Sequence, residues 1–205
     1  MTDGHSRPPY FLVVDLEATC SDDRLVVPRN EMEIIEIGAV MVDGESLQSI
    51  DEFQSFVRPV RNPQLTPFCT ELTGITQHDV DVAPRYPGVL PGLIGWFSAY
   101  PDCLFCSWGD YDRRQFERDC EYYGLEYPFL SGHLNLKDAY AQQRGLRRGC
   151  GLDRVLKSEG IPFEGRHHRG IDDARNIAKL LPLIFDPSAQ RGSPARRGSP
   201  TPPRT

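Results

Sequence analysis

The stretch Tyr10–Cys20, YFLVVDLEATC, decides the fold that we predict for this chain. Its first half, Tyr10–Val14, is an uninterrupted run of aromatic and apolar residues, which indicates a strand buried on both faces near the centre of a sheet. Asp15 and Glu17 follow, and side chains two positions apart on a strand point to the same face. Two adjacent carboxylates repel each other and lose hydration, so a divalent cation is the simplest compensation; a turn at Asp15 with a solvated Glu17 is the alternative.

The composition indicates one soluble globular domain with a tail. A length of 205 residues, with 39% hydrophobic and 25% charged residues, is enough to bury a substantial core. No apolar run is long enough to cross a bilayer, and the first ten residues lack the apolar centre of a signal peptide. We therefore expect a cytoplasmic protein with no membrane partner.

The six cysteines are scattered along the chain, so we expect no disulfide framework. Cys103 and Cys106 have the CxxC spacing found in redox and zinc sites. Their surroundings, PDCLFCSWG, are typical of a short buried strand, so we interpret both as small core residues.

Charge is distributed unevenly along the chain. The formal net charge is −6, whereas the tail from Asp186 onward carries four arginines and one acidic residue, or +3, which leaves −9 for the rest. An acidic body does not bind nucleic acid by charge alone. A nucleic-acid partner would therefore require bound metal to offset the local negative charge.

The order of the predicted elements indicates an α/β fold in which helices flank a mixed central sheet. Apolar runs and alternation predict strands at residues 10–14, 32–43, 47–57 and 103–108, the first three forming an antiparallel meander. Helical periodicity predicts helices at residues 68–72, 86–100, 110–123, 138–144, 151–158 and 171–181. Thr76 is predicted to be an N-cap, and Pro182 should end or kink the last helix.

Three segments divide the chain. Residues 1–9 are polar with paired prolines, which predicts a flexible N-terminal arm. Residues 10–185 form the folded domain. Residues 186–205 contain Gly, Ser, Pro and Arg but no large apolar residue, which predicts a disordered basic tail.

A later segment, GDYDRRQF at residues 109–116, offers further oxygen ligands of the kind that a hard cation needs. Asp110 and Asp112 lie where a buried strand passes into a helix. We interpret Asp110 as the N-cap, and Asp112 stays a candidate ligand.

A second segment, HHRGIDDARNIA at residues 167–178, adds an imidazole and a carboxylate. His168 precedes Asp173 by five positions, and Gly170 between them allows His168 to lie on a loop above an acid that opens a helix. A solvated histidine pair is the alternative.

Carboxylates with one imidazole, and no nucleophilic serine or cysteine motif or Walker-type loop, are the groups used in metal-assisted phosphodiester hydrolysis. Two metal ions roughly 4 Å apart activate a water molecule and stabilise the leaving oxygen. Histidine, whose pKa is ordinarily close to neutrality, suits the role of general base.

Five stretches, in order, resemble the DEDDh superfamily of 3′-to-5′ exonucleases. Its three exonuclease motifs are matched by DLEAT at residues 15–19, by Tyr111-Asp112 followed by Phe116, and by H-x4-D from His168 to Asp173. Five segments are similar to the Eri-type (three-prime histone exonuclease-like) RNA exonuclease branch: DLEATC, EIIEIGAV, LTGIT, GDYD and GRHHRGIDDARNIA.

The resemblance implies an RNase H-like fold, two Mg²⁺ or Mn²⁺ ions and the release of 5′-mononucleotides. It assigns Asp15, Glu17, Asp112 and Asp173 as catalytic metal ligands and His168 as the general base. Eukaryotic members usually carry an extra nucleic-acid-binding domain that this chain lacks, which weakens the expectation of structured RNA substrates.

Five further residues are candidates for substrate binding. Tyr111 and Phe68 are placed to stack on the terminal base, although a core role is the alternative for both. Leu72 and Thr73 could position the last nucleotide, and the Thr19 hydroxyl could donate to the sugar.

We therefore predict a metal-dependent 3′-to-5′ exonuclease that acts on single-stranded 3′ ends, with RNA preferred over DNA. A DNA-directed enzyme with the same chemistry and a non-catalytic nucleic-acid-binding adaptor are the alternatives. Glu36 is interpreted as a partner of the ligands or as a surface acid, not as a ligand.

Overall fold

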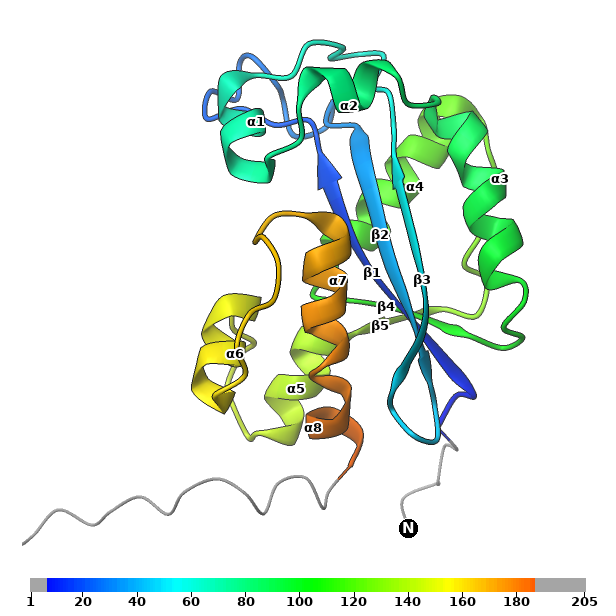
Figure 1. Cartoon of the computed structure of the whole chain (residues 1–205), viewed down its shortest axis with the longest axis vertical. Helices are drawn as coiled ribbons and strands as arrows, with labels where there is room; N and C mark the ends of the chain where they lie inside the picture. The colour runs from blue at the N-terminus through cyan, green and yellow to red at the C-terminus, as the bar shows by residue number, and fades with distance from the viewer. Residues whose placement is uncertain (1–6, 187–205) are drawn as a thin grey trace, which may run out of the picture.

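A five-stranded mixed sheet lies at the centre of the structure, a computed structural model that describes residues 7–186 (Figure 1). The strand order is β3-β2-β1-β4-β5, so the strand that contains the Tyr10–Val14 run is central, as predicted. β1 pairs antiparallel with β2 and parallel with β4. The strand bounds are β1 Tyr10–Ala18, β2 Ile34–Asp43, β3 Ser49–Phe56, β4 Leu104–Ser107 and β5 His133–Asn135.

β1 is longer than its apolar run. We expected the strand to end before Asp15, but Asp15 pairs with Gly38 and Glu17 with Glu36 on β2. The polar residues stay in the strand because their backbone groups keep the ladder hydrogen bonds of a central strand. Both carboxylates therefore project from inside the sheet rather than from a turn.

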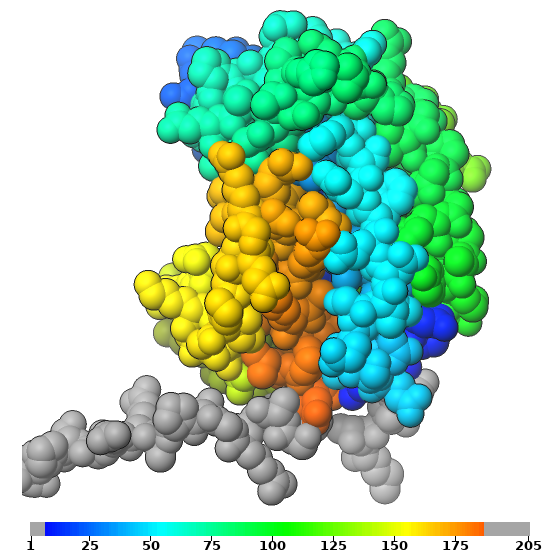
Figure 2. All heavy atoms as spheres, in the orientation of Figure 1, coloured from blue at the N-terminus to red at the C-terminus, as the bar shows by residue number. Residues whose placement is uncertain are grey.

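Helices cover both faces and one end of the sheet (Figure 1). The bounds are α1 Pro67–Thr73, α2 Gln77–Asp81, α3 Tyr86–Phe97, α4 Tyr111–Tyr123, α5 Leu136–Gln143, α6 Leu152–Glu159, α7 Gly170–Ala178 and α8 Leu181–Phe185. α3 and α4 lie against one face, and α5, α7 and α8 lie against the other, with α6 outside them. α1 and α2 lie across the end of the sheet where β1 finishes, and their atoms cover that end in Figure 2.

Side chains along β1 point alternately to the two faces of the sheet, and each face has its own hydrophobic core. Leu12, Val14 and Leu16 pack in the core under α3 and α4. Phe11 and Val13 pack in the core under α7. Because Asp15 and Glu17 continue the second series, their side chains face the α7 side.

Two elements differ from the prediction. β5 is three residues long, and its residues are only partly buried. The sequence there has no apolar run, so this strand was not predicted. The expected helix over residues 171–181 ends at Ala178, and a separate helix α8 begins at Leu181 with Pro182 in its first turn. Proline has no N–H to donate to the carbonyl of Ala178, which explains why α7 ends there.

Other local predictions are confirmed. Thr76 caps α2, and its hydroxyl accepts from the Asp79 N–H. In the CxxC segment Cys106 is fully buried in β4 and Cys103 is half-buried, as expected for core residues. All six cysteines are free thiols.

Most of the predicted arm (residues 1–9) and tail (residues 186–205) lies outside the described residues, and the boundaries at residues 10 and 185 stay predictions. Within residues 7–186, no helix combines the length and the hydrophobicity needed to cross a bilayer.

Candidate active site

Four carboxylates from three elements line one cavity of about 320 Å³ at the end of the sheet. Asp15 and Glu17 come from β1, Asp112 from the first turn of α4, and Asp173 from the first turn of α7. Carboxylate oxygens of Asp15, Glu17 and Asp173 lie within 4.8 Å of one another. The structure therefore brings together all four carboxylates that the sequence singled out, although they are up to 158 positions apart.

Asp112 is held against β1 by its own carboxylate. Its Oδ1 accepts a 3.0 Å hydrogen bond from the backbone N–H of Leu16, the residue between Asp15 and Glu17. The bond fixes the start of α4 beside the other two acids.

The expectation for Asp110 was wrong in one respect. It occupies the N-cap position of α4, but its side chain makes no capping hydrogen bond. Its backbone has φ −104° and ψ 0° instead of the extended conformation that a capping side chain requires. One of its oxygens lies 3.9 Å from Nδ1 of His133 instead.

Asp173 reaches β1 because α7 packs directly on the sheet backbone. A Cβ atom added at Gly38 on β2 would lie 2.1 Å from the carbonyl carbon of Gly170 and 2.1 Å from the nitrogen of Ile171. A Cβ at Gly170 would lie 2.9 Å from the carbonyl oxygen of Asp15. Two facing glycines therefore allow the start of α7 to approach β1 and β2 closely.

Glu36 also holds the start of α7 against the sheet. It is fully buried on β2, and its carboxylate accepts from Gly170 N–H at 3.0 Å, from Gln54 Nε2 at 2.8 Å and from Arg169 Nε at 3.1 Å. The interpretation as a surface acid is excluded, whereas that of a partner of the ligands fits these contacts. Glu36 acts by fixing the segment that carries Asp173.

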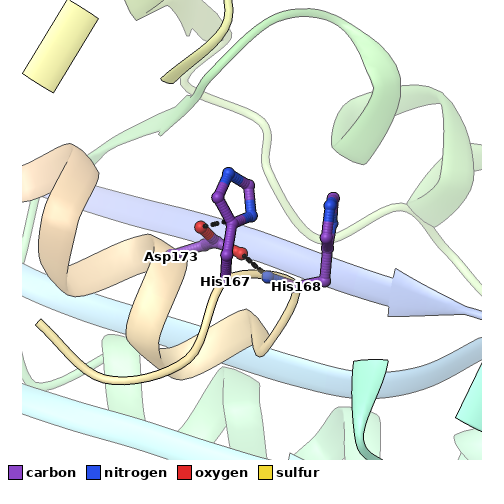
Figure 3. Close-up of side chains that lie close together, drawn as sticks. All are labelled: His167, His168 and Asp173. Atoms are coloured by element: carbon purple, nitrogen blue, oxygen red, sulfur yellow. Dashed lines mark hydrogen bonds and ion pairs between the residues drawn. The ribbon is translucent and has the colours of Figure 1, made fainter. Parts of the chain in front are cut away.

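The two neighbouring histidines have different places (Figure 3). His168 lies on the loop before α7, as predicted, and its backbone N–H donates to Asp173 Oδ2 at 2.7 Å. It is His167, however, whose ring lies over Asp173, with Nδ1 3.6 Å from Asp173 Oδ1. His167 also stacks parallel on Phe163 at 5.2 Å, which explains why it, and not His168, covers the acid.

The His168 ring is left exposed at the mouth of the cavity. Its backbone has φ +63°, a left-handed conformation that costs a non-glycine residue about 1 kcal/mol. The hydrogen bond to Asp173 offsets this cost and fixes the direction of the ring. Loss of hydration on the side of the ring that faces the protein, followed by the neighbouring His167, lowers the pKa of His168, so the neutral form predominates at pH 7.

Burial raises the pKa of every carboxyl in the cavity. For Asp15 the rise is caused by burial first and by the charge of Asp112 next. Burial, with the charge of Asp173 second, raises the pKa of Glu17 to about 9. Burial also raises the pKa of Asp112 and of Asp173 to about 6 each.

These carboxylates fit a divalent cation. Asp173 Oδ1 is buried and has no hydrogen-bond partner among residues 7–186, so an acceptor in the cavity is unsatisfied. An all-oxygen donor set suits Mg²⁺ or Mn²⁺. A cation would supply the positive charge that the crowded carboxylates lack.

The five predicted substrate contacts separate into two groups. Leu72 and Tyr111 line the cavity, and Tyr111 is 42% exposed. Phe68 does not line it but lies one turn before Leu72 on the same face of α1 and is 38% exposed. The predicted role of Leu72, Tyr111 and Phe68 in stacking on or positioning a terminal nucleotide stays a prediction.

Thr19 and Thr73 do not line the cavity. Thr19 is buried, and its hydroxyl accepts from the backbone N–H of Glu33 at 3.0 Å. Thr73 is also buried, where its hydroxyl donates to the carbonyl of Cys69 and accepts from the N–H of Ile75. Both hydroxyls are buried and bonded to the backbone, and the roles of Thr19 and Thr73 in substrate binding stay predictions.

Sequence reasoning missed several residues of the cavity wall. Besides the predicted site residues, the cavity is lined by Leu16, Ala18, Cys20, Met32, Trp108, Leu152 and His167. Trp108 could have been predicted from the sequence, because it directly follows a buried strand and precedes Asp112 by four positions, which places it at the same edge of the sheet. Leu152 could not, because its position depends on the packing of α6.

Comparison with known proteins agrees with this geometry. The family model described as Exonuclease (RNase_T) matches residues 12–181. The chain is 37% identical over 191 residues to ERI1 exoribonuclease 3 of Homo sapiens, covering 87% of the chain and 56% of that protein. It is 35% identical over 180 residues to 3′-5′ exoribonuclease 1 of Homo sapiens, covering 83% and 51%. The chain thus spans about half the length of the curated relatives that it matches.

Solved structures show the same fold. The nuclease domain of 3′hExo, a DEDDh family member bound to rAMP, superposes with a TM-score of 0.79 at 33% identity, covering 87% of this chain and 92% of that one. A 3′-exonuclease described as recognising the histone mRNA stem-loop superposes with a TM-score of 0.79 at 32% identity, covering 85% and 63%. The sheet and helices described above are therefore those of the DEDDh exonuclease fold, an RNase H-like arrangement.

Proposed function

This chain belongs to the RNase T exonuclease family, and from that membership and its cavity we propose that it is a metal-dependent 3′-to-5′ exonuclease. It hydrolyses phosphodiesters at single-stranded 3′ ends, prefers RNA and releases 5′-mononucleotides. The observation that carries the proposal is the convergence of four buried carboxylates from β1, α4 and α7 next to the exposed ring of His168.

The carboxylates of Asp15, Glu17, Asp112 and Asp173 would hold two Mg²⁺ or Mn²⁺ ions. The bound ions would supply Lewis acidity toward the phosphate and the attacking water. The chain itself contributes the fixed positions of the oxygens: Leu16 N–H orients Asp112, and His168 N–H orients Asp173.

His168 takes the proton of the attacking water in this proposal. Its lowered pKa leaves a ring nitrogen free to accept a proton at neutral pH, and its exposure at the cavity mouth leaves room for the substrate. Glu17 is a poorer base, because burial and its neighbours favour its protonated form until a cation binds.

RNA is the preferred polymer in this proposal. Support comes from the relatives, which are named exoribonucleases, and from the related nuclease domain that was solved with rAMP. The apolar surface of Leu72 and Tyr111 would contact the terminal base without distinguishing its identity.

One assay tests the proposal directly. Matched RNA and DNA oligonucleotides, labelled at the 5′ end, are incubated with the protein and Mg²⁺, and the products are identified by mass. We expect stepwise shortening from the 3′ end, 5′-mononucleotides and faster loss of RNA. Faster loss of DNA would support the DNA-directed alternative, whereas absence of hydrolysis together with metal-independent binding would support the adaptor.

A further inference from the structure

A second cavity, of about 550 Å³, adjoins the active-site cavity and is lined by arginines. Its walls are Arg29, Met32, Asp110, Tyr111, Arg114 and Arg118. Met32 and Tyr111 also line the active-site cavity, so the two spaces share a wall. We call this second cavity the arginine groove.

The groove follows one face of α4 away from the acids. Tyr111, Arg114 and Arg118 are spaced i, i+3 and i+7, which places them in one row on the helix. At 1.5 Å per residue the row spans about 10 Å. It starts beside Asp112 and ends two turns farther along the helix.

The opposite wall is fixed to α4 by hydrogen bonds. Arg118 donates to the backbone carbonyl of Arg29 at 3.1 Å, and Gln115 donates to the carbonyl of Met32 at 2.8 Å. Arg29 therefore faces the helix row from the segment between β1 and β2. The groove is part of the fold rather than a chance approach of two surface side chains.

In the described part of the chain, two of the three arginines in the groove lack side-chain partners, whereas Arg118 donates to the Arg29 carbonyl and to Gln115. Among residues 7–186, neither Arg29 nor Arg114 forms an ion pair or a side-chain hydrogen bond, and both are exposed. The neighbouring Arg113 differs, because it pairs with Glu117 at 2.6 Å. Asp110 is the single acid that lines the groove against three arginines. In a chain with a net charge of −6, such a concentration of positive charge beside the active-site cavity attracts an anionic ligand.

We propose that the arginine groove binds the phosphates of the nucleic-acid strand upstream of the 3′ end held in the active site. This inference rests on the proposed nuclease function. Arginine binds phosphate oxygens through its planar fork, and the groove can meet successive phosphates while Tyr111 and Met32 contact the bases between the two cavities. Contacts to phosphate do not distinguish RNA from DNA, so the groove gives affinity and direction but not polymer preference.

Binding, rather than hydrolysis, tests the groove. Single-stranded adenosine decamers of RNA and of DNA, labelled with fluorescein at the 5′ end, are titrated with the protein in Ca²⁺, and anisotropy is followed from low to high salt. The double variant Arg29→Ala/Arg114→Ala is compared with Arg85→Ala/Arg154→Ala, which removes two exposed arginines that line neither cavity. Far-UV circular dichroism checks that both variants fold.

We expect Arg29→Ala/Arg114→Ala to weaken decamer binding about 5- to 30-fold at low salt, equally for RNA and DNA. The slope of log affinity against log salt should fall in magnitude by about 1.4, as for two lost phosphate contacts on a single strand. A dinucleotide, whose single internucleotide phosphate is the one bound in the active site, should lose little affinity. Arg29→Lys/Arg114→Lys should restore most of the salt slope.

Any of three results would refute phosphate binding by the arginine groove: equal affinities for the groove and control variants, an unchanged salt slope, or a loss of affinity for only one of the two polymers. Failure of the proposed function would appear differently, as absence of hydrolysis by the unmodified protein with Mg²⁺. Binding in Ca²⁺ would still decide whether the groove holds phosphates.

Discussion

Replacing Gly38 with alanine tests whether the close approach of α7 to the sheet builds the metal site. The added Cβ would lie 2.1 Å from two backbone atoms at Gly170 and Ile171, whereas ordinary contact begins at 3.4 Å. Both obstacles are backbone, so no side chain can rotate away. The start of α7 must therefore move by about 1 Å, and Asp173 moves with it.

The expected cost has two parts. Overpacking of this kind costs about 1 to 3 kcal/mol of unfolding free energy. A displacement of about 1 Å at a catalytic group lowers the rate about 100-fold. The measurements are urea unfolding for stability, calorimetric titration with Mg²⁺ for metal affinity, and release of nucleotides from labelled RNA for activity.

Gly92→Ala is the matched control, because Gly92 lies inside α3 and a Cβ there meets nothing within 4 Å. This change should leave activity unaltered and stabilise the helix by up to about 1 kcal/mol. If Gly38→Ala keeps the stability, the metal affinity and the rate of the unmodified protein, α7 does not pack against Gly38 as described and the reasoning fails. If stability falls while metal affinity and rate are unaltered, only the claim that this packing positions Asp173 is refuted.

Three further predictions concern the same site. Burial raises the pKa of Glu17 from an ordinary 4.5 to about 9, so the folded state holds the proton more tightly than the unfolded state does. Without metal, the unfolding free energy should therefore fall as pH rises from about 4.5 to about 9, and saturating Mg²⁺ should reverse the trend. Thermal melts measure this, and a metal-free stability that rises over the same range would contradict it. Glu36→Ala should cost about 2 to 4 kcal/mol and lower activity, because Arg169 and the Gly170 N–H lose their shared acceptor; unfolding and rate measurements check it, and unaltered values for both would refute the role of Glu36. His168→Ala should lower the rate by a factor of about 10² to 10⁴ while the stabilisation by Mg²⁺ persists, and loss of both would assign the ring a metal-binding role instead.

The positions of the first two carboxylates of the candidate metal site follow from local sequence alone. The apolar run before Asp15 requires a buried strand, and the period of two on a strand places Asp15 and Glu17 on one face. Spacing around Gly170 likewise pointed to His168 and Asp173, whereas the choice of Asp112 over Asp110 came from the resemblance to the exonuclease motifs. Local periodicity carries this information, since it depends on residues within a few positions of one another.

Which polar groups remain free for chemistry depends on the tertiary structure. Thr19 and Thr73 form hydrogen bonds with backbone groups, and Glu36 accepts from the Gly170 N–H at the start of α7. They do so because a buried polar group must find a hydrogen-bond partner within the protein. The arginine groove was equally hidden, since its walls lie 85 positions apart at Arg29 and Arg114. Such contacts depend on long-range packing of helices on the sheet, which no local pattern of residues specifies.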